Sequence, residues 1–119
     1  MAEVNGVFQM VSKGVLRATW SALANGDTGS PLDGSRYPDK SMTVLGTFGA
    51  GGTVILEGGP PGGSYLGLND TRGEGNALSF TTADSRQVNE NPAFVRPRVT
   101  AGDGTTALTV VLECSSTKA

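Results

Sequence analysis

Hydrophobic and polar residues alternate along most of this chain, with the two-residue period of half-buried β-strands. No run of apolar residues at helical spacing interrupts the pattern. The clearest segment is 15–23, whose apolar face is expected to carry Leu16, Ala18, Trp20 and Ala22. We expect Trp20 to anchor the core, because an indole buries more apolar surface than any other side chain of this strand.

Two further runs, 41–48 and 53–57, are separated by Gly49, Ala50, Gly51 and Gly52. Glycines allow the positive φ angles of a tight turn, so the pattern predicts a hairpin whose two strands are partly apolar on both faces. A strand pair of this kind is central in a sheet or covers a partner. A shorter strand is expected at 77–81, where Leu78 and Phe80 share a face.

The last quarter of the chain, 93–113, contains two alternating runs joined by Ala101, Gly102, Asp103 and Gly104. This arrangement predicts a second hairpin. Pro97 lies inside its first run and has no N–H to donate, so it predicts an edge strand or a bulge.

The remaining segments are less regular. Residues 25–40 contain two turn signals and two prolines, which predicts a long projecting surface loop. Residues 1–14 are expected to form a first strand or an arm that becomes ordered on a partner. Residues 15–119 are expected to form the domain itself. The fold class is therefore all-β: a single-domain antiparallel β-sandwich or jelly-roll-like barrel.

Composition supports this picture and narrows the function. The chain has 18 glycines and 6 prolines among 119 residues, as expected for short strands joined by turns. Its net charge is −2 with no basic run, so direct binding to nucleic acid is not expected. The start lacks the pattern of a signal peptide and no segment is apolar enough to span a bilayer, so we expect a cytosolic protein that does not enter membranes.

Candidate chemistry is sparse. The chain has no histidine, which removes the commonest general base and the usual zinc ligands. Its aspartates occur mostly in turn contexts and show no calcium-loop spacing, so we expect no catalytic, cofactor or metal site. The single cysteine, Cys114, ends an apolar strand and is expected to pack as a small hydrophobic residue. The chain is therefore not expected to be an enzyme.

Arg96 and Arg98 are the most notable polar pair, because residues two apart in a strand share a face. Adjacent guanidinium groups can hold the carboxylates of a partner. A solvated face, or pairing with Glu113 across the predicted hairpin, is the alternative.

Three segments are distinctive when taken in order: VLRATWSALANGDTGSPL at 15–32, SMTVLGTFGAGGTVILEG at 41–58 and NPAFVRPRVTAGDGTTALTVVLE at 91–113. Together they resemble the capsid decoration or cement proteins of tailed bacteriophages. The resemblance extends from about Val15 to Glu113, and the GGPPGGS segment at 58–64 departs from it.

The resemblance implies a virion protein on the outer capsid surface that clamps neighbouring major capsid subunits as a homo-oligomer, a dimer or a trimer. The residues expected to contact a partner are Val7, Phe8, Met10, Arg36, Tyr37, Arg96 and Arg98. Removing residues 1–12 is expected to abolish head binding and to leave the β-type circular dichroism spectrum unchanged. A carbohydrate-binding or host-adhesion module, or a tail or head-fibre component, is the alternative.

Overall fold

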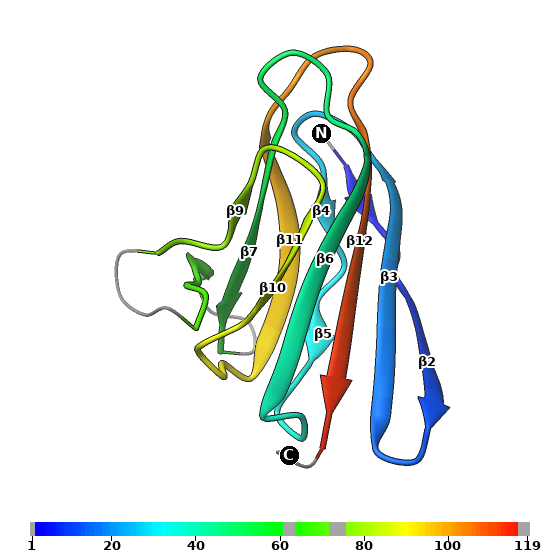
Figure 1. The fold of residues 1–119 in the computed structure, drawn as a ribbon, viewed down its shortest axis with the longest axis vertical. Helices are drawn as coiled ribbons and strands as arrows, with labels where there is room; N and C mark the ends of the chain where they lie inside the picture. Colours follow the sequence, from blue (N-terminus) through cyan, green and yellow to red (C-terminus); the bar gives the residue numbers. More distant parts are fainter. Residues whose placement is uncertain (1, 61–63, 72–75, 117–119) are drawn as a thin grey trace.

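Two β-sheets packed face to face make up the fold of residues 2–60, 64–71 and 76–116, which the computed structural model describes (Figure 1). These residues form strands and no helix. Among their strand pairings, all are antiparallel except that of β1 with β4. The predicted class, an all-β single domain with two antiparallel sheets, is confirmed.

The seven-stranded sheet, called sheet A, has the order β1, β4, β11, β7, β8, with β5 also paired to β11 and β9 to β7. Its strands are β1 (Glu3–Val4), β4 (Thr28–Gly29), β5 (Leu32–Asp33), β7 (Thr53–Gly59), β8 (Leu66–Gly67), β9 (Ser79–Phe80) and β11 (Phe94–Ala101). Sheet B has the order β10, β6, β12, β3, β2. Its strands are β2 (Val7–Ser12), β3 (Val15–Leu23), β6 (Asp39–Thr47), β10 (Asp84–Gln87) and β12 (Ala107–Ser115). The two edges of sheet B are therefore β2 and β10.

The two predicted hairpins are wrong, because their strands lie in different sheets: β6 and β12 belong to sheet B, β7 and β11 to sheet A. Alternation shows which side chains share a face, but consecutive strands can pack across the core as well as pair. The connections 48–52 and 102–106 both cross between the sheets at the top of Figure 1. The Asp103 carboxylate joins them by accepting the Ala50 amide at 2.8 Å.

Pro97 lies inside sheet A and not at its edge, because β11 has β7 on one side and β4 and β5 on the other. On the β4 and β5 side, the Val99 amide donates to the Asp27 carbonyl at 2.9 Å, and Val95 pairs with Leu32. Pro97 falls between these contacts, where the neighbouring chain passes from β4 to β5. A residue without an N–H is tolerated there because no continuous ladder faces it.

The segment 25–40 also differs from its prediction as a projecting loop. It carries β4 and β5, which complete sheet A, and it continues into β6. Leu32 is buried, and the Ser30 carbonyl accepts the Trp20 indole N–H at 3.0 Å. These short strands consist largely of turn-forming residues, so the sequence shows no strand pattern there. They form strands only because β11 pairs with them.

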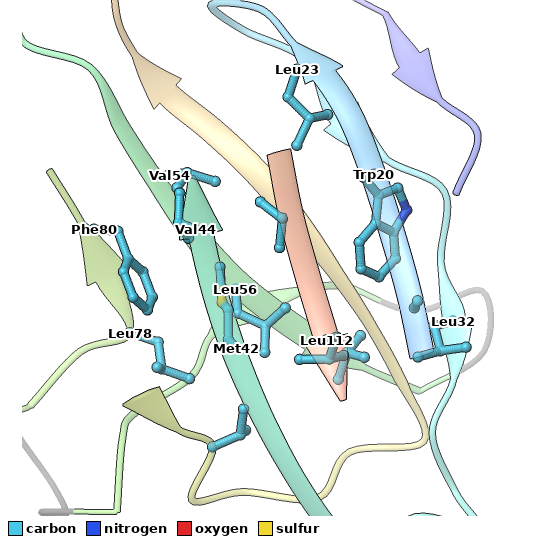
Figure 2. Packing of buried hydrophobic residues seen from close by; sticks show 14 of the residues in the cluster. Trp20, Leu23, Leu32, Met42, Val44, Val54, Leu56, Leu78, Phe80 and Leu112 are labelled. Carbon is cyan, nitrogen blue, oxygen red and sulfur yellow. The ribbon is translucent and has the colours of Figure 1, made fainter. Parts of the chain in front are cut away.

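The core lies between the two sheets (Figure 2). Trp20 is fully buried in it, as predicted, and Leu78 and Phe80 share a buried face. Burying a large apolar side chain contributes roughly 1.5–3 kcal/mol, so a core of this size can hold the sandwich without a disulfide. The buried apolar residues from the central strands include Ala18, Met42, Val44, Val54, Leu56, Val95, Val99, Leu108, Val110 and Leu112.

One residue of the predicted apolar face of β3 points elsewhere: Ala22 is exposed. The pairing of β3 with β12 shifts between Leu108 and Val110, which places a β-bulge at this point. Ala22 adopts a φ of 57°, and the next buried side chain is Leu23. The bulge inserts one residue and so reverses the alternation that the sequence pattern assumed.

Candidate partner-binding surfaces

The most unusual surface is β2, because all six of its residues are exposed. Val7 is 62% exposed, Met10 55% and Phe8 40%. Within the described residues, β2 pairs with β3 alone, so its other edge is open. From the sequence, this segment was expected to form either a first strand or an arm. In the structure it forms β2, an edge strand of sheet B.

The core-facing side of β2 is held in place by aromatic side chains. Phe8 meets Trp20 edge to face, with ring centroids 5.7 Å apart and an interplanar angle of 70°. The Tyr37 hydroxyl donates to the Met10 sulfur at 3.7 Å, and Tyr37 packs against the core. The structure therefore brings Phe8, Met10 and Tyr37 together, with Arg36 exposed beside Tyr37.

The chain reaches this position because the N-terminal residues bind both sheets. Strand β1 pairs with β4 in sheet A, and β2 pairs with β3 in sheet B. Gly6 lies between them, and a Cβ built on it would be 2.7 Å from the Trp20 indole nitrogen. The Gly6 amide donates to the Ser30 hydroxyl at 2.9 Å. Only a residue without a side chain fits where the chain passes over the indole.

Arg96 and Arg98 share the outer face of β11 in sheet A, as the alternation predicts. Their partner is Glu57 of β7, whose side chain is 4% exposed. Arg96 Nε lies 2.7 Å from one Glu57 oxygen and Arg98 Nε 3.2 Å from the other. The Tyr65 ring lies over the Arg96 guanidinium, with 4.1 Å between the guanidinium carbon and the ring centroid.

This geometry corrects the expected pairing with Glu113. That residue lies in sheet B and binds Arg17 at 2.7 Å. Two guanidinium groups share one carboxylate, so the cluster keeps one positive charge. The Arg98 side chain is 47% exposed and can donate to a partner carboxylate. Sequence reasoning missed Glu57, because only the register of β7 against β11 places it opposite Arg96.

A buried lysine lies at the start of β6. Lys40 is 1% exposed, and its ammonium group donates to the Tyr37 carbonyl and to Asn91 Oδ1, the latter at 2.9 Å. Burial lowers the pKa of Lys40. Burial likewise raises the pKa of the neighbouring Cys114 thiol to about 11, so little thiolate exists at neutral pH. Cys114 packs as a small hydrophobic residue, as the sequence predicts.

Of the aspartates expected in turns, Asp27, Asp33 and Asp103 stabilise turns, whereas Asp39 and Asp84 begin the strands β6 and β10. Asp27 accepts the Ala24 amide at 3.0 Å, and Asp33 accepts the Ser35 amide at 3.0 Å. Asp103 accepts the amides of Ala50 and Thr105, and these bonds lower its pKa to about 2. In the part of the chain that the structure describes, no three acidic or cysteine side chains lie together as in a metal site, and no helix is present that could cross a membrane.

The fold has relatives among solved structures. The sequence itself matches no protein-family model and no curated protein. The structure of the SPBc2 prophage-derived protein YomS matches 89% of this chain and 98% of its own, with a TM-score of 0.65 at 12% identity. The PBSX exported protein XepA matches 89% of this chain with a TM-score of 0.61 at 12% identity, and this chain spans 40% of it. A recombinant oxalate oxidase matches less well, with a TM-score of 0.48 at 16% identity. At these identities the comparisons establish the fold, and two of its relatives derive from prophages.

Proposed function

We propose that this chain is a bacteriophage virion structural protein that decorates the outer surface of the head and cements neighbouring major capsid subunits. It is synthesised in the host cytoplasm and acts on the expanded capsid as a homo-oligomer, without catalysis and without a cofactor. The observation that carries the proposal is β2, an uncharged edge strand with exposed apolar side chains on both faces.

Three observations support the proposal at different levels. The prophage origin of YomS and XepA supports a phage protein in general. The ordered resemblance of segments 15–32, 41–58 and 91–113 supports the decoration role in particular. The apolar surface at β2 and Tyr37 supports protein partners, because contiguous exposed apolar side chains mark such contacts.

The physical mechanism is thermodynamic linkage between the binding of this protein and the stability of the capsid lattice. A protein that binds the expanded lattice and not its disassembled subunits stabilises the lattice in proportion to the logarithm of its free concentration over its dissociation constant. Each capsid contact can be weak, because an oligomer that engages several sites raises the effective concentration of the remaining ones. The exposed cations Arg36 and Arg98 are the groups we assign to carboxylates on the capsid.

Electron microscopy of heads tests the proposal. Expanded heads assembled without this protein are incubated with the purified chain and imaged. We expect density on the outer surface between capsid subunits, and heads that withstand a higher temperature before they release their contents. Density confined to the tail, or no binding to heads, would refute the proposal.

Charge reversal identifies the capsid contacts. Arg98→Glu and Arg36→Glu are expected to weaken head binding by at least about tenfold each, because each replaces an attraction with a repulsion. Lys13→Glu, which reverses another exposed cation, is the matched control and should bind as the unmodified protein does. Equal losses in all three variants would indicate long-range attraction and not specific contacts.

The structure also changes the deletion experiment. Removing residues 1–12 would take away β1 and β2 and uncover Trp20, so the folded domain itself would be altered. Point substitutions are therefore the sharper test.

The alternative role as a carbohydrate-binding module loses support, because Trp20 is buried, Tyr37 packs against the core and Arg96 covers one face of Tyr65.

A further inference from the structure

The open edge of β2 is a place where a further strand can add to sheet B. Half of the amide and carbonyl groups of an edge strand point away from its only neighbour and can pair with another chain. In Figure 1, β2 forms the outer margin of sheet B beyond β3. Edge strands are normally protected by charged residues, prolines or a covering segment. The sequence of β2, VFQMVS, contains neither charge nor proline, and its pairing with β3 is regular from Val7 to Met10, with a shift only between Met10 and Ser12.

We propose that β2 pairs antiparallel with β2 of a second copy of this chain, about a two-fold axis that is perpendicular to the sheet and passes midway between Gln9 of one copy and Gln9 of the other. The two five-stranded sheets would then join into one continuous sheet of ten strands. Such an interface uses the same surface on both copies, as a two-fold dimer requires. The inference rests on the homo-oligomer of the proposed function and names its surface.

The register about Gln9 gives the most contacts between apolar side chains of the two copies. A two-fold axis perpendicular to the sheet keeps each face on its own side, so residues pair only at even sums of their numbers. At a sum of 18, Phe8 lies opposite Met10 of the second copy on both sides of the axis, within the part of β2 that pairs regularly with β3. Moving the register by two residues would place Gln9 opposite Val7 or Val11 and leave one symmetric apolar pair, Phe8 with Phe8 or Met10 with Met10, in place of two Phe8–Met10 contacts.

The core-facing half of this interface is already positioned. Phe8 is held against Trp20 and Met10 against Tyr37, so both side chains are restrained before a second copy arrives. Preformed contact residues lose less conformational entropy on association. The outer face carries Val7 and Gln9, with Gln9 paired to Arg17 of β3. No charge of β2 itself has to be removed from water.

Substitutions at the symmetry centre test the proposal. In the proposed register Gln9 faces Gln9 of the second copy, so Gln9→Lys or Gln9→Glu places like charges directly opposite each other. Purified protein is measured by sedimentation equilibrium over a dilution series, with a mass of 12.1 kDa for the monomer. We expect a dimer for the unmodified protein and an increase of at least about tenfold in the dissociation constant for each variant.

Mixing the two variants gives the decisive result. Gln9→Lys and Gln9→Glu together should form a heterodimer, because opposite charges then face each other at the axis. Gln87→Lys is the matched control on β10, the opposite edge of sheet B, and should leave the dimer unchanged. Circular dichroism confirms that each variant is folded.

Three outcomes would overturn the proposal. These are a monomeric unmodified protein, an oligomer that neither Gln9 variant weakens, and variants that do not associate when mixed. A monomer that nevertheless decorates heads would refute the β2 pairing and the homo-oligomer and leave the decoration role standing, with a capsid strand as the occupant of the edge. A dimer that fails to bind heads would do the reverse.

Discussion

The two edges of sheet B, β2 and β10, are built from opposite kinds of residue. β10 reads DSRQ, and its polar groups are engaged: Arg86 binds Asp84 at 3.3 Å, and Gln87 donates to Asp39 at 2.6 Å. Arg86 also lies 4.9 Å over the Phe80 ring. β2 reads VFQMVS and exposes apolar side chains on both faces.

This difference explains how sheet B can be protected from pairing with another strand at one edge and available for pairing at the other. Charged and polar side chains on β10 disfavour the approach of another strand, since they would lose water without gaining a partner. β2 has no such protection, and its exposed apolar groups gain free energy when covered. The contrast therefore marks β2 as the edge that association would use.

Removal of Trp20 should have the largest effect, because this indole supports β2 from beneath. Trp20→Ala is expected to lower the free energy of unfolding by about 3–5 kcal/mol, through lost burial and an unfilled cavity. Phe8→Ala should cost less, about 1–2 kcal/mol, because Phe8 remains 40% exposed. Urea titration of dilute protein measures both. Equal losses would mean that Phe8 serves the core and not a partner.

Making β10 resemble β2 should have the next largest effect. The double variant Ser85→Val and Gln87→Val replaces exposed polar groups of β10 with apolar ones. We expect this variant to self-associate, with light scattering several-fold above the unmodified protein at equal concentration. Thr109→Val, on the central strand β12, is the control and should scatter normally. Unchanged scattering in the double variant would show that side-chain polarity does not protect this edge.

A smaller effect is expected from Lys40, whose carbonyl accepts the Val88 amide just after β10. Burial lowers the pKa of Lys40 below 10.5, so the unfolded chain holds this proton more tightly than the folded one. Lys40 should therefore contribute a rise in the free energy of unfolding as the pH increases toward 10.5, which the raised pKa of Cys114 opposes above pH 9.0. Lys40→Met should flatten that rise in urea titrations at a series of alkaline pH values. An unchanged slope would show that another group causes it.

The smallest effect is expected at Asp103, which is remote from both edges in the loop that joins β11 to β12. Its pKa is lowered from 3.8 to about 2, chiefly by the Ala50 amide. The stability it contributes is complete above pH 3.8 and is lost as the pH falls toward about 2. Asp103→Asn should reduce the loss of thermal stability over this acidic range and leave association at both edges unaltered. A change in oligomeric state would contradict the separation of loop and edge.

Local alternation located the long strands well. Residues 15–23 form β3 at the predicted bounds, and the runs at 41–48 and 53–57 correspond to β6 and β7. The short strands β4 and β5 were missed, because two-residue strands rich in Thr, Gly, Leu and Asp carry no period. They are strands only because β11 lies beside them.

The sequence predicted some features of the candidate contact residues and not others. The apolar residues Val7, Phe8 and Met10 stand out in the sequence, but their exposure on an edge strand depends on β3 covering one side only. The shared face of Arg96 and Arg98 follows from strand period, whereas their common partner Glu57 is 39 residues away from Arg96.

The sequence by itself determined the all-β class, the positions of the long strands and the buried place of Trp20, because these depend on side-chain patterns within a few residues. The tertiary structure alone decided which sheet each strand joins, that Pro97 lies inside a sheet and that β2 is an open edge. The reason is that pairing between distant strands depends on packing across the whole core, and a local pattern carries no information about it.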